Sequence, residues 1–259
     1  MLDDIVNSTR MRLDERKRRV PLDDLVRQAG KRPAPRDFAK AISGEGVSII
    51  AEVKKASPSK GVIREDFDPV AIARAYANGG AAAISVLTEE KYFQGSLEYL
   101  KSIDNELGDN RPPLLRKDFI VDAYQVYEAR AYGADAVLLI VAILTPAELA
   151  ELLDLTHRLG MTALVEAHDE NEVEAAVESG AGVIGINNRD LKTFKVDIKA
   201  TARLRPLIPA DRLVVSESGI ATREDIEYLR GVGVDAVLIG EALMTAPDVE
   251  RRLRELIHG

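Results

Sequence analysis

The sequence predicts a closed (β/α)8 TIM barrel with an N-terminal helical extension, because short apolar runs alternate with amphipathic stretches from residue 48 onward. Eight apolar runs stand about 27 residues apart on average, a spacing typical of βαβ units. Barrels of this type take about 250 residues, and the chain has 259. A doubly wound open sheet is the alternative, but no run is followed by Gly-x-Gly-x-x-Gly.

The expected strands and helices follow one another along the chain. In order, the strands are Ser48–Val53, Ala82–Leu87, Pro113–Arg116, Asp135–Val141, Met161–Val165, Gly182–Ile186, Arg212–Ser216 and Asp235–Ile239. Between strands, Thr145 reads as an N-cap, with Pro146 at the first helical position and Glu148 as the capping-box acid. Gly160 marks the end of that helix, and Thr222 begins another in the same way.

The first 47 residues lie outside the repeat. Residues 1–30 are expected to be helical, and Lys31–Arg36 is a basic connector that contains proline. Their apolar stripe is thin, and isolated helices of this length are marginal in water. We therefore interpret residues 1–47 as an extension packed on the barrel, and residues 1–259 as a single domain.

Composition excludes several classes of protein. The chain has no cysteine, so disulfides, zinc–thiolate sites, iron–sulfur clusters and cysteine nucleophiles are excluded. The net charge of −8 disfavours nucleic acid as a partner. The longest apolar run, Ala136 to Leu144, is too short for a bilayer, which needs about 20 residues, and no signal-peptide pattern is visible. We expect a cytoplasmic protein that binds no membrane, and a monomer in preference to a homodimer.

Polar side chains stand at the carboxyl ends of the expected strands, where barrels place their chemistry. They are Glu52, Lys54, Lys117, Glu166, Asn187, Arg189 and Glu217. Residues two apart share a strand face, so Glu52 and Lys54 are expected to point the same way as Ile50. A mixed lysine–carboxylate cluster offers both a proton donor and a proton acceptor. A stabilising ring of ion pairs is the alternative interpretation.

Two glycine-containing loops follow the seventh and eighth strands. One contains Ser218 and Gly219, and the other begins at Gly240 and continues into a short helical turn. Backbone amides in such loops bind phosphate in barrels of this type, although each motif alone is also typical of an ordinary turn. Together they predict a phosphate site, to which Lys54 could add a cation.

Other residues carry a weaker signal. The segment Ser57–Gly61 follows Lys54 and is expected to form a mobile loop beside the site. Phe93 and Phe119 lie in loops and serve either as lid packing or as an aromatic wall against a ring. His168 is expected to begin a helix. The three histidines are scattered along the chain, so we expect no metal site.

Several motifs in order resemble the indole-3-glycerol phosphate synthase family. The matching segments are IAEVKKASPS at 50–59, TE at 88–89 with YFQGS at 92–96, LRKDF at 115–119, ALVE at 163–166, GINNRDL at 185–191 and SESGI at 216–220. The resemblance spans the barrel and reaches the N-terminal extension. Glu241 departs from it, since some members carry a small serine there, and the chain has no tryptophan. An acid at 241 would have to point away from the phosphate or be tolerated because backbone amides bind it.

The resemblance implies an activity. Members convert 1-(2-carboxyphenylamino)-1-deoxyribulose 5-phosphate into indole-3-glycerol phosphate, carbon dioxide and water, a lyase reaction of tryptophan biosynthesis. The carboxylate leaves as the aromatic ring is regained, so no electron-sink cofactor is required. The implied partner is a small phosphorylated substrate. The extension is expected to dock over the catalytic rim, where it would shield the aromatic ring.

The resemblance also implies roles for residues. Lys117 would be the general acid of ring closure and Glu166 the base of dehydration. Lys54 would be either a second acid or an anion ligand, Glu52 would orient the lysines, and Asn187 would hold a substrate hydroxyl. The implied substrate-binding set is Ser57, Phe93, Phe119, Arg189, Glu217, Ser218, Gly219, Leu238 and Gly240.

Two other classes of function stay open from the residues. One is a Schiff-base aldolase of the same fold, with Lys117 as the nucleophile. The other is a catalytically silent barrel that binds phosphate or serves as a scaffold. The completeness of the charged rim argues against the second.

Overall fold

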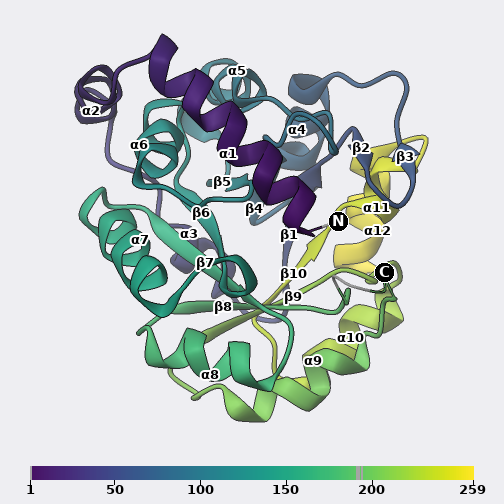
Figure 1. The fold of residues 1–259 in the computed structure, drawn as a ribbon. Helices are drawn as coiled ribbons and strands as arrows, with labels where there is room; N and C mark the ends of the chain where they lie inside the picture. Colours follow the sequence, from purple (N-terminus) through teal and green to yellow (C-terminus); the bar gives the residue numbers. More distant parts are fainter. Residues whose placement is uncertain (1, 191–192, 194) are drawn as a thin grey trace.

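The computed structural model describes residues 2–190, 193 and 195–259. Met1, from the expected first helix, and Leu191, which ends one family motif, lie outside these ranges. The main body is a closed barrel of parallel strands wrapped by helices (Figure 1).

Eight strands of the described chain form the barrel. They are β1 (Ser48–Val53), β4 (Ala83–Leu87), β5 (Leu114–Lys117), β6 (Ala136–Ile140), β7 (Thr162–Ala167), β8 (Val183–Asn187), β9 (Leu213–Glu217) and β10 (Ala236–Ile239). Each lies within two residues of its expected bounds. Strand β1 pairs with both β4 and β10, which closes the sheet. The predicted barrel is confirmed, and the open sheet is wrong.

A two-stranded antiparallel ribbon, β2 (Ala56–Ser57) and β3 (Gly61–Val62), folds within the loop after β1. The helices of the barrel are α4 (Pro69–Gly79), α5 (Leu97–Leu107), α6 (Ala123–Ala131), α7 (Pro146–Arg158), α8 (Glu170–Glu178), α9 (Lys199–Leu204), α10 (Arg223–Val232), α11 (Glu241–Met244) and α12 (Val249–His258). Short 3-10 turns lie at Gly108–Asn110, Val141–Ile143 and Arg205–Leu207.

The expected helix starts are confirmed. Thr145 and Glu148 form a reciprocal capping box at the start of α7, and Thr222 forms one with Asp225 at the start of α10. These caps satisfy amide groups that a helix leaves without an internal partner. Gly160 takes a positive φ of 75°, which ends the turn after α7.

The strands divide their side chains between two cores because successive residues point to opposite faces. Ile50, Leu115, Leu164 and Leu238 point inward and fill the barrel. Their neighbours point outward and pack against the helices, as Ile49 does. The inward set continues into the polar residues at the strand ends, so the strand period itself carries Glu52 and Lys117 to the open mouth.

The N-terminal extension contacts both the mouth of the barrel and its interior. It forms α1 (Leu2–Arg19), α2 (Leu22–Gly30) and α3 (Phe38–Ile42), with a break at Pro21 between the first two helices. The start of α1, purple in Figure 1, reaches the mouth of the barrel, while α2 lies against α6. Phe38 and Ile42 of α3 are fully buried among the interior residues of the barrel. The extension therefore also supplies part of the interior core.

In the part of the chain that the structure describes, no helix combines the length and the apolar character needed to cross a bilayer.

Candidate active site

A cavity of about 940 Å³ opens at the carboxyl ends of the strands. All fourteen residues singled out from the sequence line it: Glu52, Lys54, Ser57, Phe93, Lys117, Phe119, Glu166, Asn187, Arg189, Glu217, Ser218, Gly219, Leu238 and Gly240. Leu2 and Ile5 at the start of α1 add apolar surface to its wall, a contribution that no local motif marked. The closed barrel thus brings residues from every third of the chain into one site.

Lys117 lies at the centre of the charged floor. Its Nζ is 3.4 Å from Oε2 of Glu166 and 3.5 Å from Oε2 of Glu217. Burial alone would lower the pKa of Lys117, but the carboxylates of Glu166, Glu217 and Glu52 outweigh burial and raise it. The ammonium therefore stays protonated at neutral pH, which equips Lys117 to donate a proton.

The two carboxylates that flank Lys117 differ in their protonation. Burial would raise the pKa of Glu166, but the positive charges of Lys117 and His168 hold it well below its usual range. Burial and the Glu166 carboxylate raise the pKa of Glu217 to about 8, against the effect of Lys117. At neutral pH Glu166 is thus a charged proton acceptor, and Glu217 holds a proton. Two neighbouring carboxyl groups of unequal pKa are typical of acid–base sites.

Glu52 and Lys54 form an ion pair across the end of β1, and both side chains are largely buried. Gly240 closes over this pair. A Cβ atom at residue 240 would collide with the Glu52 carboxylate and would lie 2.8 Å from Nζ of Lys54. Glycine is therefore required here by close approach to the ion pair.

The loop after β9 is held in an uncommon backbone conformation. Ser218 has φ 70° and Gly219 has φ 79°, values that non-glycine residues rarely adopt. The Asn188 side chain supports this loop, since its Nδ2 donates to the Ser218 carbonyl at 3.0 Å and to Ser216 Oγ at 3.0 Å. Of the two neighbouring asparagines, Asn187 lines the cavity, whereas Asn188 supports the loop after β9. Sequence reasoning missed Asn188.

Glu241 begins α11 directly after Gly240. Its Oε1 lies 3.3 Å from Nζ of Lys60, in the loop between β1 and α4. Both side chains are exposed, so this pair contributes little stability. The contact with Lys60 does give the Glu241 carboxylate an oppositely charged partner beside the glycine loop. This accounts for an acid at a position where the family resemblance leads us to expect a small residue.

The aromatic residues Phe93 and Phe119 form one wall of the cavity. Their ring centroids are 6.1 Å apart and their planes are tilted by 38°. The loop that carries Phe93 is organised by Glu89, whose carboxylate accepts hydrogen bonds from the backbone amides of Lys91, Tyr92 and Phe93 at 2.7 to 3.1 Å. These hydrogen bonds hold the backbone of Phe93 in place, so this part of the wall does not lie on an unsupported loop.

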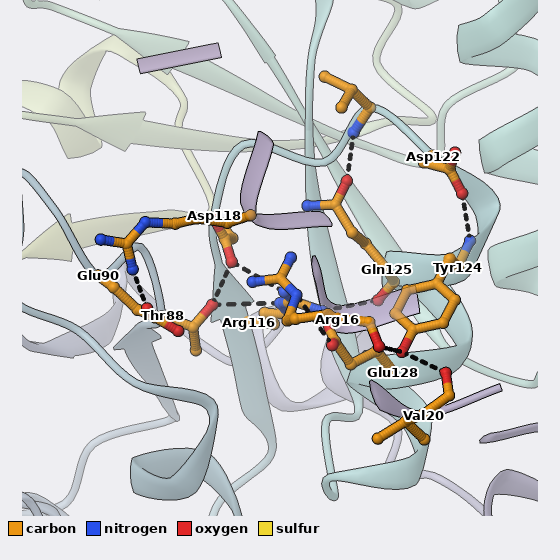
Figure 2. A network of polar contacts seen from close by, with 12 residues as sticks. Arg16, Val20, Thr88, Glu90, Arg116, Asp118, Asp122, Tyr124, Gln125 and Glu128 are labelled. Atoms are coloured by element: carbon orange, nitrogen blue, oxygen red, sulfur yellow. Dashed lines mark hydrogen bonds and ion pairs between the residues drawn. The ribbon is translucent and has the colours of Figure 1, made fainter. Parts of the chain in front are cut away.

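Figure 2 shows a network of polar contacts around Arg116, the residue before Lys117 in β5. Arg116 points away from the cavity and is fully buried, with Nη2 2.8 Å from Asp118 Oδ2 and Nη1 3.0 Å from Glu128 Oε2. Arg16 of α1 reaches the other oxygen of Glu128 at 3.2 Å. Removing one member of such a network leaves a buried charge without compensation. The network therefore ties α1 and α6 to the end of β5.

Two further residues near the carboxylates were not predicted as site residues from the sequence. Gly185 of β8 leaves room for Glu217, whose Oε1 a Cβ atom at that position would strike. His168, expected at a helix start, precedes α8 and lies against Glu166. Gly185 acts through the neighbouring strand β9, and His168 acts through Glu166 of β7 and Glu172 of α8. A single sequence does not display these contacts.

Comparisons with known proteins show which family and which fold this chain resembles. The family model described as indole-3-glycerol phosphate synthase matches residues 2–256. The indole-3-glycerol phosphate synthase of Dehalococcoides mccartyi strain CBDB1 is 57% identical over 99% of this chain and 100% of that protein. The one from Roseiflexus sp. strain RS-1 is 51% identical over 99% and 97%. The solved 3-hexulose-6-phosphate synthase of Salmonella typhimurium has a TM-score of 0.64 at 12% identity, covering 81% and 96%, which shows the shared fold.

Proposed function

The chain belongs to the indole-3-glycerol phosphate synthase family, and we propose that its barrel mouth carries out that reaction on 1-(2-carboxyphenylamino)-1-deoxyribulose 5-phosphate. As a member of this family, the chain is a carboxy-lyase of tryptophan biosynthesis. The observation that supports the site assignment best is the contact of Lys117 with both Glu166 and Glu217 on the floor of the cavity. The glycine loops after β9 and β10 line the same cavity.

Ring closure joins the substrate's aromatic carbon to the carbonyl carbon of its ribulose chain. The carbonyl oxygen gains negative charge as this bond forms, and Lys117 donates a proton to it. The raised pKa of Lys117 keeps that proton available at neutral pH. Loss of carbon dioxide then restores the aromatic ring, and the electron pair of the broken bond returns to the ring system.

Dehydration completes the indole. Glu166 accepts a proton from the ring CH2 carbon beside the nitrogen, and the electron pair of that C–H bond forms the new C=C bond. The adjacent C–O bond breaks at the same time, and an acid protonates the departing hydroxyl group to give water. Lys54, paired with Glu52, is the candidate acid, and its alternative task is to hold the substrate carboxylate. General acid–base help of this kind contributes about 10²–10⁴-fold to a rate. Asn187 lies in the cavity beside these groups and suits a hydroxyl contact.

Substrate position follows from the walls of the cavity. We assign the phosphate to Ser218, Gly219 and Gly240, whose loops offer backbone amides. Arg189 or Lys54 holds the substrate carboxylate. The aromatic ring lies against the Phe93 and Phe119 wall. Ser57, Leu238 and Glu217 complete the binding set, all three from the cavity lining.

A Schiff-base aldolase fits the site less well. An amine nucleophile needs a depressed pKa so that it carries a free electron pair. The carboxylates around Lys117 raise its pKa instead. Borohydride trapping with a keto-sugar phosphate tests this alternative, and we expect no covalent adduct at Lys117.

We further propose a single domain over residues 1–259, with residues 1–47 as its extension. The burial of Phe38 and Ile42 within the barrel supports this assignment. The net charge of −8 favours a small-molecule partner over nucleic acid. We propose a cytoplasmic monomer that acts on its phosphorylated substrate without a membrane.

The direct experiment is a turnover assay on the purified chain. Indole fluorescence should rise when 1-(2-carboxyphenylamino)-1-deoxyribulose 5-phosphate is added, with one carbon dioxide released per product. A folded protein that binds the substrate but forms no indole would refute the proposed function. Trapping of a lysine adduct in that protein would then favour the aldolase.

A further inference from the structure

A histidine lies directly behind the proposed base. His168 follows the end of β7, and its side chain is only 11% exposed. Its Nε2 lies 3.3 Å from Oε1 of Glu166. His168 is absent from the cavity lining, so it touches the site through Glu166.

Glu172 of α8 holds this ring in place from the opposite side. Its Oε2 accepts hydrogen bonds from the His168 backbone amide at 2.8 Å and lies 2.9 Å from the ring Nδ1. Asp169 caps α8 through the Glu172 amide at 3.0 Å, which ties Glu172 to the helix start. The imidazole thus has one carboxylate at each nitrogen.

This arrangement requires a charged ring. If Nδ1 donates to Glu172, a neutral imidazole would turn the lone pair of Nε2 toward the Glu166 oxygen, which is repulsive. A proton on both nitrogens removes that conflict. The charged groups that face the ring are Glu166 on β7 and Glu172 on α8. Burial lowers the pKa of His168, but these two carboxylates prevail and raise it to about 10.

The two oxygens of Glu166 are therefore divided between two cations. Oε1 faces His168 and Oε2 faces Lys117 at 3.4 Å. We propose that His168, held by Glu172, is a positioning residue that fixes the rotation of the Glu166 carboxylate for proton transfer. This inference rests on the proposed function, because it assigns a support to the base of dehydration.

Steady-state kinetics of three variants test the inference. His168→Leu removes both ring contacts and should lower kcat by on the order of 10-fold, and at most the 10²-fold that a displacement of about 1 Å can cause. KM should stay within about twofold, because the binding loops are untouched. His168→Gln offers an amide donor toward Glu166 and should recover part of the loss. His157→Leu, on the exposed face of α7, is the matched control and should behave as the parent.

Rapid-quench measurements identify the affected step. His168→Leu should accumulate the same decarboxylated intermediate as Glu166→Gln, since both changes impair dehydration. Equal kcat values for His168→Leu and the parent would overturn the inference. A rise in KM with unchanged kcat, or a loss in kcat that glutamine does not recover, would assign His168 a purely structural role instead.

Nuclear magnetic resonance tests the charge of the ring without any turnover. The chain has three histidines, so ¹⁵N-histidine labelling gives few signals, and the two leucine variants assign them. Both nitrogens of His168 should remain protonated at pH 8, and Glu172→Gln should shift its titration to lower pH. A neutral ring at pH 7 would overturn the inference. Failure of the parent to form indole would instead overturn the proposed function, while these signals would still test the contact with Glu166.

Discussion

Lys117→Met keeps the unbranched, apolar part of the side chain and removes the charged ammonium group. The ammonium stands 3.4 and 3.5 Å from two carboxylate oxygens. Because Glu217 holds a proton at neutral pH, the charged pair is the one with Glu166, and at an effective dielectric constant of about 20 it interacts by about 5 kcal/mol. Protonation of Glu166 would limit this loss, because neutralising an ordinary glutamate at pH 7 costs only about 3.7 kcal/mol. The variant should therefore take up a proton at Glu166 and lose no more than about 4 kcal/mol of unfolding free energy.

Catalysis should suffer more than folding. The lost general acid should lower kcat by about 10²–10⁴-fold, whereas phosphate and ring contacts should hold the affinity for substrate within a few fold. Indole fluorescence measures kcat, calorimetric titration with a non-reacting reduced analogue measures binding, and urea denaturation measures stability. Lys101→Met, on the exposed surface of α5, is the matched control and should match the parent. A kcat for Lys117→Met within a few fold of the parent would refute the assignment of Lys117 as the acid.

Four other outcomes follow from the same geometry. Glu166→Gln should accumulate a decarboxylated intermediate in rapid-quench samples, and a build-up of unreacted substrate alone would contradict its assignment as the base of dehydration. Glu217 has a folded-state pKa of about 8, above its ordinary value in the unfolded chain. The folded state thus holds a proton that the unfolded state has lost, so the parent should lose stability relative to Glu217→Gln as pH rises from about 4.5 to about 8. If the unfolding free energies of the parent and of Glu217→Gln changed in parallel with pH, the raised pKa of Glu217 would be excluded. Gly240→Ala should lower kcat/KM by up to about 10²-fold through displacement of the ion pair beneath it, whereas Gly231→Ala, where a Cβ meets open space, should be neutral. Phe38→Ala should cost about 3–5 kcal/mol of unfolding free energy in urea denaturation, and an unchanged midpoint would show that α3 is not part of the core.

The last of these outcomes revises one expectation about the extension. If the extension only docked over the rim, deletion of residues 1–40 would leave a folded barrel with weaker substrate binding. The structure places Phe38 among the inward-facing residues of the barrel, where it is fully buried. That deletion should therefore reduce stability as well as affinity, because it opens a cavity beneath the inward-facing strand residues.

The sequence by itself determined the strands, their order and the side of each strand that faces inward. These features follow from local rules, since side chains alternate along a strand and each helix carries its own start and stop residues. The alternation placed Glu52 and Lys117 in phase with buried interior residues such as Leu115. The glycine loops and the family resemblance supplied the other candidates. This is why all fourteen candidates could be found without coordinates.

Only the tertiary structure decided which of these groups touch. The contact of Lys117 with Glu217 depends on closure of the barrel, which sets distances between strands far apart in the chain. The opposite pKa shifts of Glu166 and Glu217 depend on those distances and on burial, and neither is encoded in residue type. The role of His168 could not be predicted from the sequence for the same reason. It depends on contacts with Glu166 at the end of β7 and with Glu172 on α8, which only the folded chain brings together. Local periodicity fixes the direction of a side chain, while packing of the whole chain fixes its partners.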